Sequence, residues 1–200
     1  MTILAIDTTN EHGSIAITED ERVIEEVSLP PGDGFGHILF GEIENLLLRN
    51  GLRLADMDAF ASASGPGTFT GVRVGLTAVK GLAEALSRKV VVVSNLKTMA
   101  YFGTRELRAP MLDARRGDVY GAVYNAELEL VREEVVMKQD AWLASLPVDV
   151  EVLTEPRLLA GAIGRIAARE CAVGRALDPA MVDANYVRRS DAEMMWQDVR

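Results

Sequence analysis

The chain has 200 residues, of which 48% are hydrophobic and 26% are charged, and these values are typical of a soluble globular protein. Its formal net charge is −9, from 30 acidic and 21 basic side chains, which argues against a protein that holds nucleic acid by itself through an extended basic surface. The single cysteine, Cys171, excludes an intrachain disulfide, and the sequence has neither a secretory leader nor a run of 18 apolar residues, so we expect a cytoplasmic protein with no membrane span.

Strand and helix signals alternate along the first half of the chain. Three short apolar runs, residues 3–6, 13–18 and 22–29, are separated by polar turns and predict an antiparallel meander. Apolar residues then recur at helical spacing over residues 35–48. The later signals are a strand at 59–64, a helix that ends near Leu86, a β-branched strand at 90–94 and a helix at 95–102. The predicted order is βββαβαβα, which indicates an α/β lobe.

The second half repeats this theme with fewer elements. The apolar run that ends at Asp113 resembles the one that ends at Asp7, and each is followed by a glycine and an alternating strand. The remaining signals are strands at 119–124, 128–136 and 150–153 and a helix at 158–168. We therefore predict two related α/β lobes, residues 1–103 and 104–200, of which the second is reduced.

Two sets of residues are candidates for an anion or nucleotide site. A glycine-rich loop precedes the long helix, and backbone N–H groups at such a helix start can hold an anion. Two aspartates end the strands that open the two lobes, and paired carboxylates facing a cleft can bind a metal–nucleotide complex. The alternative, which the pattern alone favours, is that the glycines form a tight turn and each aspartate caps its own backbone. The candidates are Asp7, Thr8, Gly65, Gly67, Thr68 and Asp113.

The helix that follows this loop has a broad apolar surface. A row of small residues lies beside a row of bulky apolar ones. The resulting apolar surface is wider than the stripe that a helix packed on one side needs. Small residues allow another helix to approach closely. The pattern leaves two alternatives open, which are burial inside its own lobe and a protein–protein contact shared with the helix at 35–48. The candidate interface residues are Ile38, Leu39, Ile43, Leu46, Gly71, Val72, Gly75, Ala78, Val79 and Leu82.

No pattern for metal binding or for a serine nucleophile is present in the sequence. His12 and His37 are the only histidines, they are not spaced as a metal-binding pair, and there is no cysteine cluster. The sequence also lacks the Gly-x-Ser-x-Gly elbow of a serine hydrolase. We therefore expect no metal ion and no cofactor.

Three motifs together resemble the TsaB (YeaZ) family. They are Ile-Leu-Ala-Ile-Asp-Thr-Thr at residues 3–9, Gly-Pro-Gly-Thr-Phe-Thr-Gly-Val-Arg-Val-Gly at 65–75, and Leu-Asp-Ala-Arg-Arg-Gly-Asp-Val-Tyr at 112–120. The ending Asn-Tyr-Val-Arg-Arg at 185–189 also matches. The resemblance covers most of the chain in the right order, and the glycine-rich block is its most specific part.

The resemblance implies an actin/Hsp70-like (ASKHA) fold of two related lobes. It implies a subunit that is not an enzyme itself but pairs, through helices of the first lobe, with a catalytic relative called TsaD. TsaD transfers a threonylcarbamoyl group to the adenosine beside the anticodon of tRNAs that read ANN codons, and a separate ATPase, TsaE, joins the complex. The resemblance also implies a homodimer when the chain is alone, and contact with tRNA only indirectly through the complex.

Two other classes of function are open alternatives. A nucleotide-dependent enzyme of the same fold, such as a small kinase or hydrolase, would use Asp7, Asp113 and the loop at 65–70 around the phosphates. A peptidase is the third class. The missing histidine pair argues against it, because catalytic zinc needs about three protein ligands.

Overall fold

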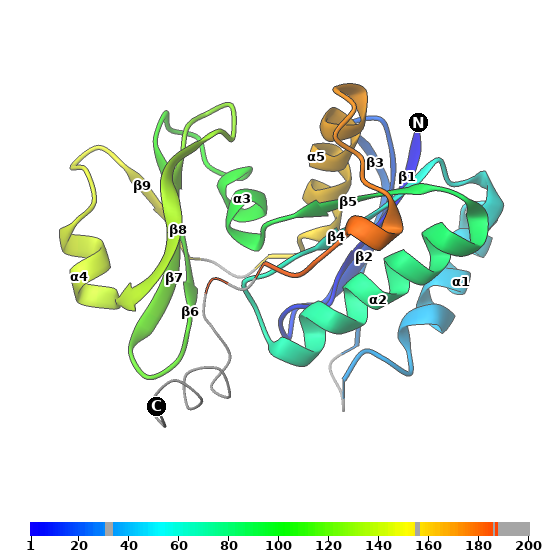
Figure 1. Ribbon diagram of the computed structural model, residues 1–200, viewed down its shortest axis with the longest axis horizontal. Helices are drawn as coiled ribbons and strands as arrows, with labels where there is room; N and C mark the ends of the chain where they lie inside the picture. Colours follow the sequence, from blue (N-terminus) through cyan, green and yellow to red (C-terminus); the bar gives the residue numbers. More distant parts are fainter. Residues whose placement is uncertain (31–33, 155–156, 186, 188–200) are drawn as a thin grey trace.

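Two β-sheets form two lobes that lie side by side in the computed structural model (Figure 1). The structure describes residues 1–30, 34–154, 157–185 and 187. Three residues of the matching ending, Tyr186, Arg188 and Arg189, lie outside the described residues. None of the helices in the described part of the chain is long and apolar enough to cross a membrane.

The first sheet has five strands in the order β3-β2-β1-β4-β5. Its antiparallel part consists of β1 (Thr2–Asp7), β2 (Ser14–Glu19) and β3 (Arg22–Ser28). The two parallel strands are β4 (Ala59–Ala63) and β5 (Lys89–Val93). Strand β1 lies at the centre, which explains why its sequence is a continuous apolar run rather than an alternating one.

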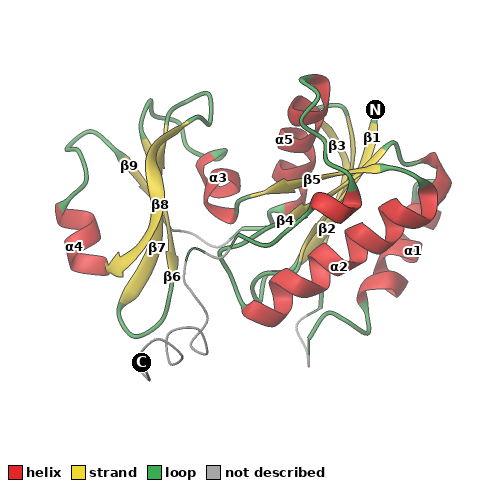
Figure 2. Ribbon diagram, in the orientation of Figure 1, coloured by secondary structure: helices red, strands yellow, loops and turns green. Residues whose placement is uncertain are grey.

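Helices cover both faces of this sheet (Figure 2). One face carries α1 (Leu39–Arg49) and α2 (Phe69–Leu86), and the other carries α5 (Ala160–Ala172). Successive residues of a strand point to opposite faces. Leu4 therefore belongs to the core under α1 and α2, whereas Ile3 belongs to the core under α5.

The second sheet has four strands in the order β8-β7-β6-β9. The antiparallel strands are β6 (Arg108–Asp113), β7 (Asp118–Tyr124) and β8 (Leu130–Lys138), and β9 (Glu151–Leu153) pairs in parallel with β6. On one side the short α4 (Gln139–Ala144) places Trp142 against Gly121, where a Cβ atom would lie 2.4 Å from the indole. On the other side α3 (Asn95–Ala100) packs between the two sheets.

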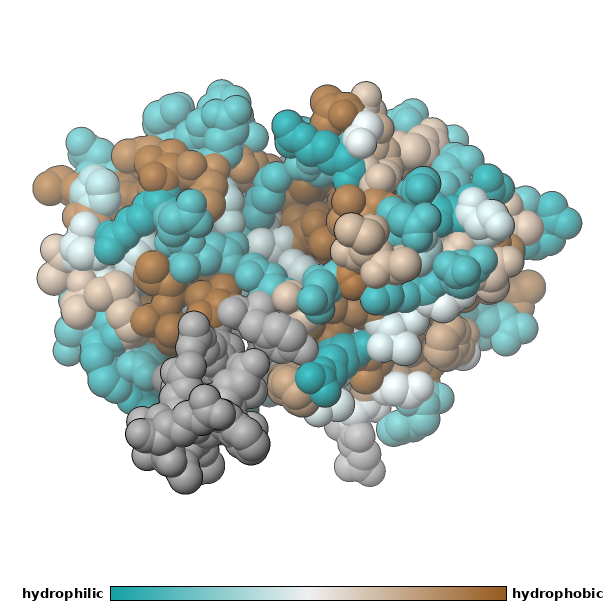
Figure 3. Space-filling model, viewed as in Figure 1, coloured by the Kyte–Doolittle hydropathy of each residue, from teal (hydrophilic) through white to brown (hydrophobic). Residues whose placement is uncertain are grey.

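Apolar residues gather on the surface of the second lobe, at the left of the space-filling view (Figure 3). Leu130, Val131 and Val148 are among its exposed apolar side chains. The cluster of fully buried residues beside α4 is small and consists of Ala109, Val119, Val123 and Trp142.

The α/β class and the two-lobed architecture of the ASKHA fold are confirmed, with a reduced second lobe. In chain order, residues 1–103 run βββαβαβα, and the elements that follow run βββαβα, of which the last helix, α5, packs on the first sheet. Two details differ from the prediction. Helix α1 begins at Leu39 rather than at residue 35, and α4 was not predicted because six residues are too few for a helical period to show.

The chain also returns to the first lobe after β9, which the predicted boundary at residues 103 and 104 does not provide for. Helix α5 packs on β1, β2 and β3, and the 3₁₀ turn Pro179–Met181 packs on α2. Small residues make this close packing feasible. A Cβ on Gly164 would lie 2.5 Å from the methyl carbon of Thr18, so the helix can sit this close only with glycine there.

Candidate functional site

The β1–β2 turn and the β4–α2 loop lie against each other at one edge of the first sheet. Because β1 and β4 are adjacent parallel strands, the segments that follow them emerge together. The Thr68 N–H donates to the Thr9 carbonyl at 2.7 Å, and the Thr8 hydroxyl donates to the Gly71 carbonyl at 2.7 Å. A Cβ on Gly71 would lie 2.0 Å from the Thr8 carbonyl oxygen, so this contact requires glycine.

Asp7 is fully buried inside this junction. Its Oδ1 accepts hydrogen bonds from the Thr9 N–H at 2.9 Å and from the Thr9 hydroxyl at 2.6 Å. Its Oδ2 is buried and has no hydrogen-bond partner within the described part of the chain. Burial raises the pKa of the Asp7 carboxyl, although the hydrogen bonds from Thr9 act in the opposite direction. Asp7 therefore organises its own turn.

Asn95 closes the same junction from the start of α3, and the sequence analysis did not single it out. Its side-chain oxygen accepts from the Gly65 N–H at 3.0 Å, and its Nδ2 donates to the Thr9 hydroxyl at 2.6 Å. The signal was present in the sequence, because Ser94 after a buried strand is a helix-capping residue and places the next side chain at the sheet edge.

The loop therefore uses its own N–H groups within the chain. The Gly65 N–H is bound by Asn95, the Thr68 N–H by Thr9, and the Gly71 N–H by the Thr68 hydroxyl, which caps α2 at 3.2 Å. These contacts are those of the structural alternative, a tight turn. A nucleotide or anion at Asp7, Thr8, Gly65, Gly67 and Thr68 stays a prediction.

Asp113 belongs to a different part of the molecule. It ends β6 in the second sheet, and its Oδ1 accepts from the Arg115 N–H at 2.8 Å in its own turn. Among the described residues it has no hydrogen bond to the candidates of the first lobe. No group of three His, Cys, Asp or Glu side chains that could hold a metal ion is found over the same residues.

Most of the predicted interface residues are buried inside the first lobe. Six apolar side chains among them are at most 5% exposed, and Gly71 and Gly75 are buried as well. A Cβ on Gly75 would lie 2.8 Å from the Ser62 hydroxyl, so the flat half of α2 faces its own sheet. Burial inside the lobe therefore accounts for these residues, and their part in a subunit contact stays a prediction. Ile38 and Leu82 are partly exposed. The buried apolar residues are Leu39, Ile43, Leu46, Val72, Ala78 and Val79.

The outer faces of the same two helices have a different character. On α1, Phe40 is 55% exposed and Leu48 is 69% exposed, and their spacing of eight residues puts them on one face. At the start of α2, Phe69 is 51% exposed. Gly41 and Gly81 lie inside α1 and α2, and a Cβ on either would have no neighbour within 4 Å. A glycine inside a helix costs about 0.5–1 kcal/mol relative to alanine, and the described residues offer no compensating contact.

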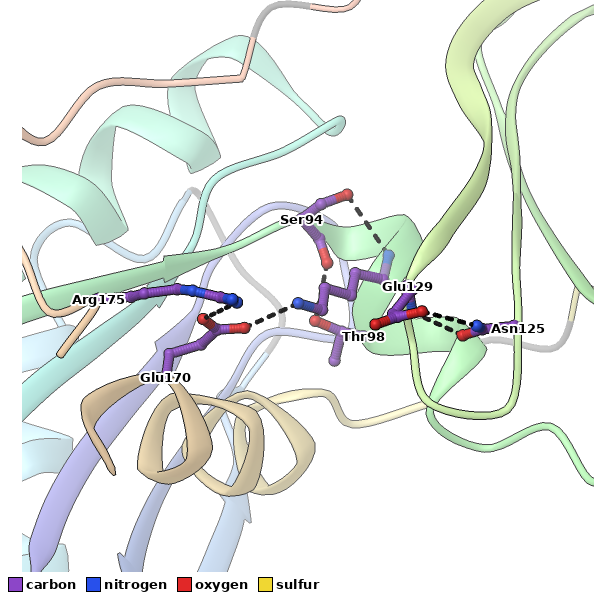
Figure 4. Close-up of polar contacts among 7 residues, drawn as sticks. Ser94, Thr98, Asn125, Glu129, Glu170 and Arg175 are labelled. Carbon is purple, nitrogen blue, oxygen red and sulfur yellow. Dashed lines mark hydrogen bonds and ion pairs between the residues drawn. The ribbon is translucent and has the colours of Figure 1, made fainter. Parts of the chain in front are cut away.

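Ion pairs fix α5 against α3 at the junction of the two lobes. Glu170 of α5 binds Lys97 of α3 at 2.9 Å and Arg175 at 3.1 Å (Figure 4). Burial alone would raise the pKa of the Glu170 carboxyl, but the hydrogen bonds and charges of these two cations outweigh it and lower the pKa below its ordinary value.

A second polar cluster joins the two lobes at Glu134 of β8. This carboxylate accepts hydrogen bonds from the Ser94 hydroxyl, from the Tyr124 hydroxyl at 2.8 Å and from the Asn185 amide at 2.7 Å. Burial, followed by the charge of Glu134, raises the pKa of Tyr124. The sequence gives no sign of this cluster, because its four members come from four separate segments.

Comparison with known families and proteins agrees with the resemblance. The family model described as "TsaD: tRNA N6-adenosine threonylcarbamoyltransferase" matches residues 35–152, which is more than half of the chain. The Bacillus subtilis "tRNA threonylcarbamoyladenosine biosynthesis protein TsaB" is 37% identical over 146 residues, 72% of this chain and 63% of the relative. The Escherichia coli protein of the same description is 38% identical over 131 residues, 64% of this chain and 56% of the relative. The matched part of the chain thus spans less than two thirds of the length of these curated relatives.

A solved structure supports the same relationship. A Pseudomonas aeruginosa protein, described as similar to the peptidase YeaZ, superposes with a TM-score of 0.81 at 27% identity, over 94% of this chain and 99% of that one. A second structure, "YeaZ from Pseudomonas aeruginosa", gives 0.78 at the same identity. The chain belongs to the TsaB (YeaZ) family, a branch of the wider family that the TsaD model describes.

Proposed function

We propose that this chain is a non-catalytic cytoplasmic subunit that pairs with a TsaD-like threonylcarbamoyltransferase in the modification of tRNA. Its family and the names of its relatives support the pathway. The assignment of a partner role depends on one observation, which is the pair of exposed apolar side chains, Phe40 and Leu48, on the outer face of α1.

This outer face has the features of a helix-packing surface. Exposed Phe40 and Leu48 supply apolar area, and burying such area contributes about 25 cal/mol per Å², whereas the guanidinium of Arg73 already lies 3.6 Å over the Phe69 ring. Gly41 and Gly81 leave open space beside the backbone, which allows a second helix to approach closely. A related subunit with the same first lobe would present equivalent helices, so the same face also fits a homodimer when the chain is alone. We propose a TsaE-like ATPase as a further member of the complex.

The alternative of an independent nucleotide-dependent enzyme has less support. The N–H groups of Gly65, Thr68 and Gly71 are bound within the chain, and Asp7 is enclosed by its own turn. A phosphate that used these three N–H groups would have to displace their present hydrogen bonds.

Co-purification with the TsaD-like subunit of the same organism tests the proposal. Leu48→Glu and Phe40→Asp each place a charge on the outer face, and we expect either to reduce the association at least tenfold while the monomer melts as before. Val131→Glu is the matched control, because Val131 is 57% exposed but lies on β8 of the second lobe. Equal association of all three variants with the TsaD-like subunit would reject the proposed contact.

A further inference from the structure

Two aromatic rings follow α3 at the junction of the lobes. Tyr101 and Phe102 meet edge to face with their ring centroids 5.6 Å apart, and both are partly exposed. Neither ring takes part in the helix contact proposed above, because α3 lies between the two sheets, away from α1 and α2 (Figure 1).

Guanidinium groups from separate segments converge on these rings. Arg157 lies over the Phe102 ring at 5.0 Å. Arg165 and Arg169 of α5 each lie 6.0 Å from the centroid of Tyr101, and Arg165 donates to the Tyr101 hydroxyl at 2.8 Å. These distances fall within the range of cation–π attraction. Two rings and three arginines thus form one surface, which we call the arginine–aromatic cluster.

The charge of this cluster is opposite to that of the whole chain, which is −9. Arg169 is paired with Glu21 at 2.6 Å. Arg165 has a buried Nε with no hydrogen-bond partner among the described residues, and its Nη1 is bound by a neutral hydroxyl. A fourth guanidinium, that of Arg108, donates to the Ala100 carbonyl at 3.2 Å beside the rings. Four guanidinium groups therefore stand beside two carboxylates here, those of Glu21 and of Glu151 next to Arg157, in a protein that is acidic overall.

A recess adjoins the cluster. A cavity of about 260 Å³ is lined by Phe102 and Arg157 together with Met99, Glu151, Val152, Leu153 and Thr154. Its walls combine an aromatic face, a guanidinium, apolar side chains and the carboxylate of Glu151, whose Oε2 accepts hydrogen bonds from the Thr104 and Arg105 N–H groups. A planar ring that enters this recess would lie beside Phe102.

We propose that the arginine–aromatic cluster is a contact surface for single-stranded RNA, with phosphates on the arginines and an unstacked base against Phe102. Single-stranded RNA is recognised by stacking of its bases on aromatic rings and on guanidinium planes, and by cations along the backbone. That the RNA is a tRNA rests on the function proposed above. The assignment of this surface as a contact for single-stranded RNA does not depend on that function. The inference replaces the expectation that tRNA is reached only through the partner subunit.

The test is filter binding of the purified chain to an unmodified transcript of a tRNA that reads an ANN codon, over a range of salt concentrations. The double variant Arg157→Gln/Arg169→Gln removes two phosphate contacts. We expect its affinity to fall at least tenfold, and the slope of log K against log salt to decrease in magnitude by about 1.4, which is about 0.7 for each phosphate contact on a single strand. Arg53→Gln is the matched control, because Arg53 is also paired with a carboxylate, Asp56, but belongs to the segment before β4. We expect it to bind as the wild type does.

Phe102→Leu separates stacking from charge. We expect it to weaken binding about fivefold with an unchanged salt slope, and ultraviolet cross-links to map to Tyr101 or Phe102. Equal affinity and slope for the wild type and the double variant, cross-links elsewhere, or no salt-dependent binding by the wild type would each overturn the inference. The same variants are also tested for pairing with the TsaD-like subunit. We expect this pairing to be unchanged, because the substitutions lie outside the α1–α2 face. Failure of the RNA proposal is therefore distinguishable from failure of the pairing proposal.

Discussion

The two faces of α2 carry glycines for opposite reasons. On the inner face, a Cβ on Gly71 would lie 2.0 Å from a carbonyl oxygen and one on Gly75 would lie 2.8 Å from two hydroxyls, so the sheet and the β1–β2 turn dictate glycine. On the outer face, a Cβ on Gly81 would meet nothing within 4 Å in the described part of the chain. The inner glycines are required by contacts within the chain, whereas no contact among the described residues requires glycine at position 81.

A stripe of small residues indicates that a helix leaves space beside its backbone, but not whether that space is filled by the same chain or by another. Both faces of α2 look alike in the sequence, because a glycine at either one leaves the same space beside the helix. Only the distance from a hypothetical Cβ to its neighbours separates packing inside a lobe from a surface that is open to a partner.

The largest expected effect comes from filling the inner face. Gly71→Ala puts a methyl group against the Thr8 carbonyl, which is backbone and cannot move as a side-chain end can. We expect a loss of about 3 kcal/mol in the free energy of unfolding, measured by urea denaturation. If Gly71→Ala proved no more destabilising than an alanine on the outer face of α2, the contrast between the two faces would be wrong.

Removing the buried charge beneath the inner face should have the next largest effect. The pKa of Asp7 in the folded state is raised above its ordinary value of 3.8. Between the unfolded and the folded pKa, the folded state holds more protons than the unfolded state. The free energy of unfolding therefore falls as the pH rises through this range. Asp7→Asn cannot ionise but still accepts from Thr9. We expect it to gain about 2 kcal/mol over the wild type at pH 8 and little at pH 4.

Urea denaturation at several pH values measures this difference directly. An identical pH dependence for Asp7→Asn and the wild type would mean that Asp7 is not held in a closed junction, and would favour an open site that binds a counter-ion.

The architecture was largely predictable from the sequence, whereas the site was not. The strand β1 and the helix α2 follow from local apolar patterns, and the duplication follows from the two runs that end in Asp7 and Asp113. The return of α5 to the first sheet does not, because periodicity shows that a helix has an apolar face but not which sheet it covers. The arginine–aromatic cluster was missed for the same reason, since its members lie far apart in the sequence.

Helix α5 lies on the opposite face of the first sheet and is held there partly by ion pairs. Glu170→Gln removes the pairing of α5 with Lys97 and Arg175. Because the native pKa of Glu170 is lowered from 4.5, the stabilisation is present above that pH and is lost as the pH falls through the native pKa. We expect a loss of about 1 kcal/mol at pH 7 and a difference that disappears once the pH has fallen below the native pKa of Glu170. An undiminished difference there would assign the effect to packing instead of charge.

Gly81→Ala has the smallest expected effect on stability and separates the two faces most sharply. The added methyl group meets open space, and alanine has the higher helix propensity, so the isolated chain should gain about 0.5–1 kcal/mol in its free energy of unfolding. The same methyl group would fill the space that a partner helix needs. We therefore expect weaker association with the TsaD-like subunit in a titration calorimeter, and a larger loss for Gly81→Trp. A substitution that strengthens the fold while weakening the pairing has no explanation within a single chain. If Gly81→Ala instead improved both, the outer glycine would have no role in the contact, and the partner would have to bind elsewhere.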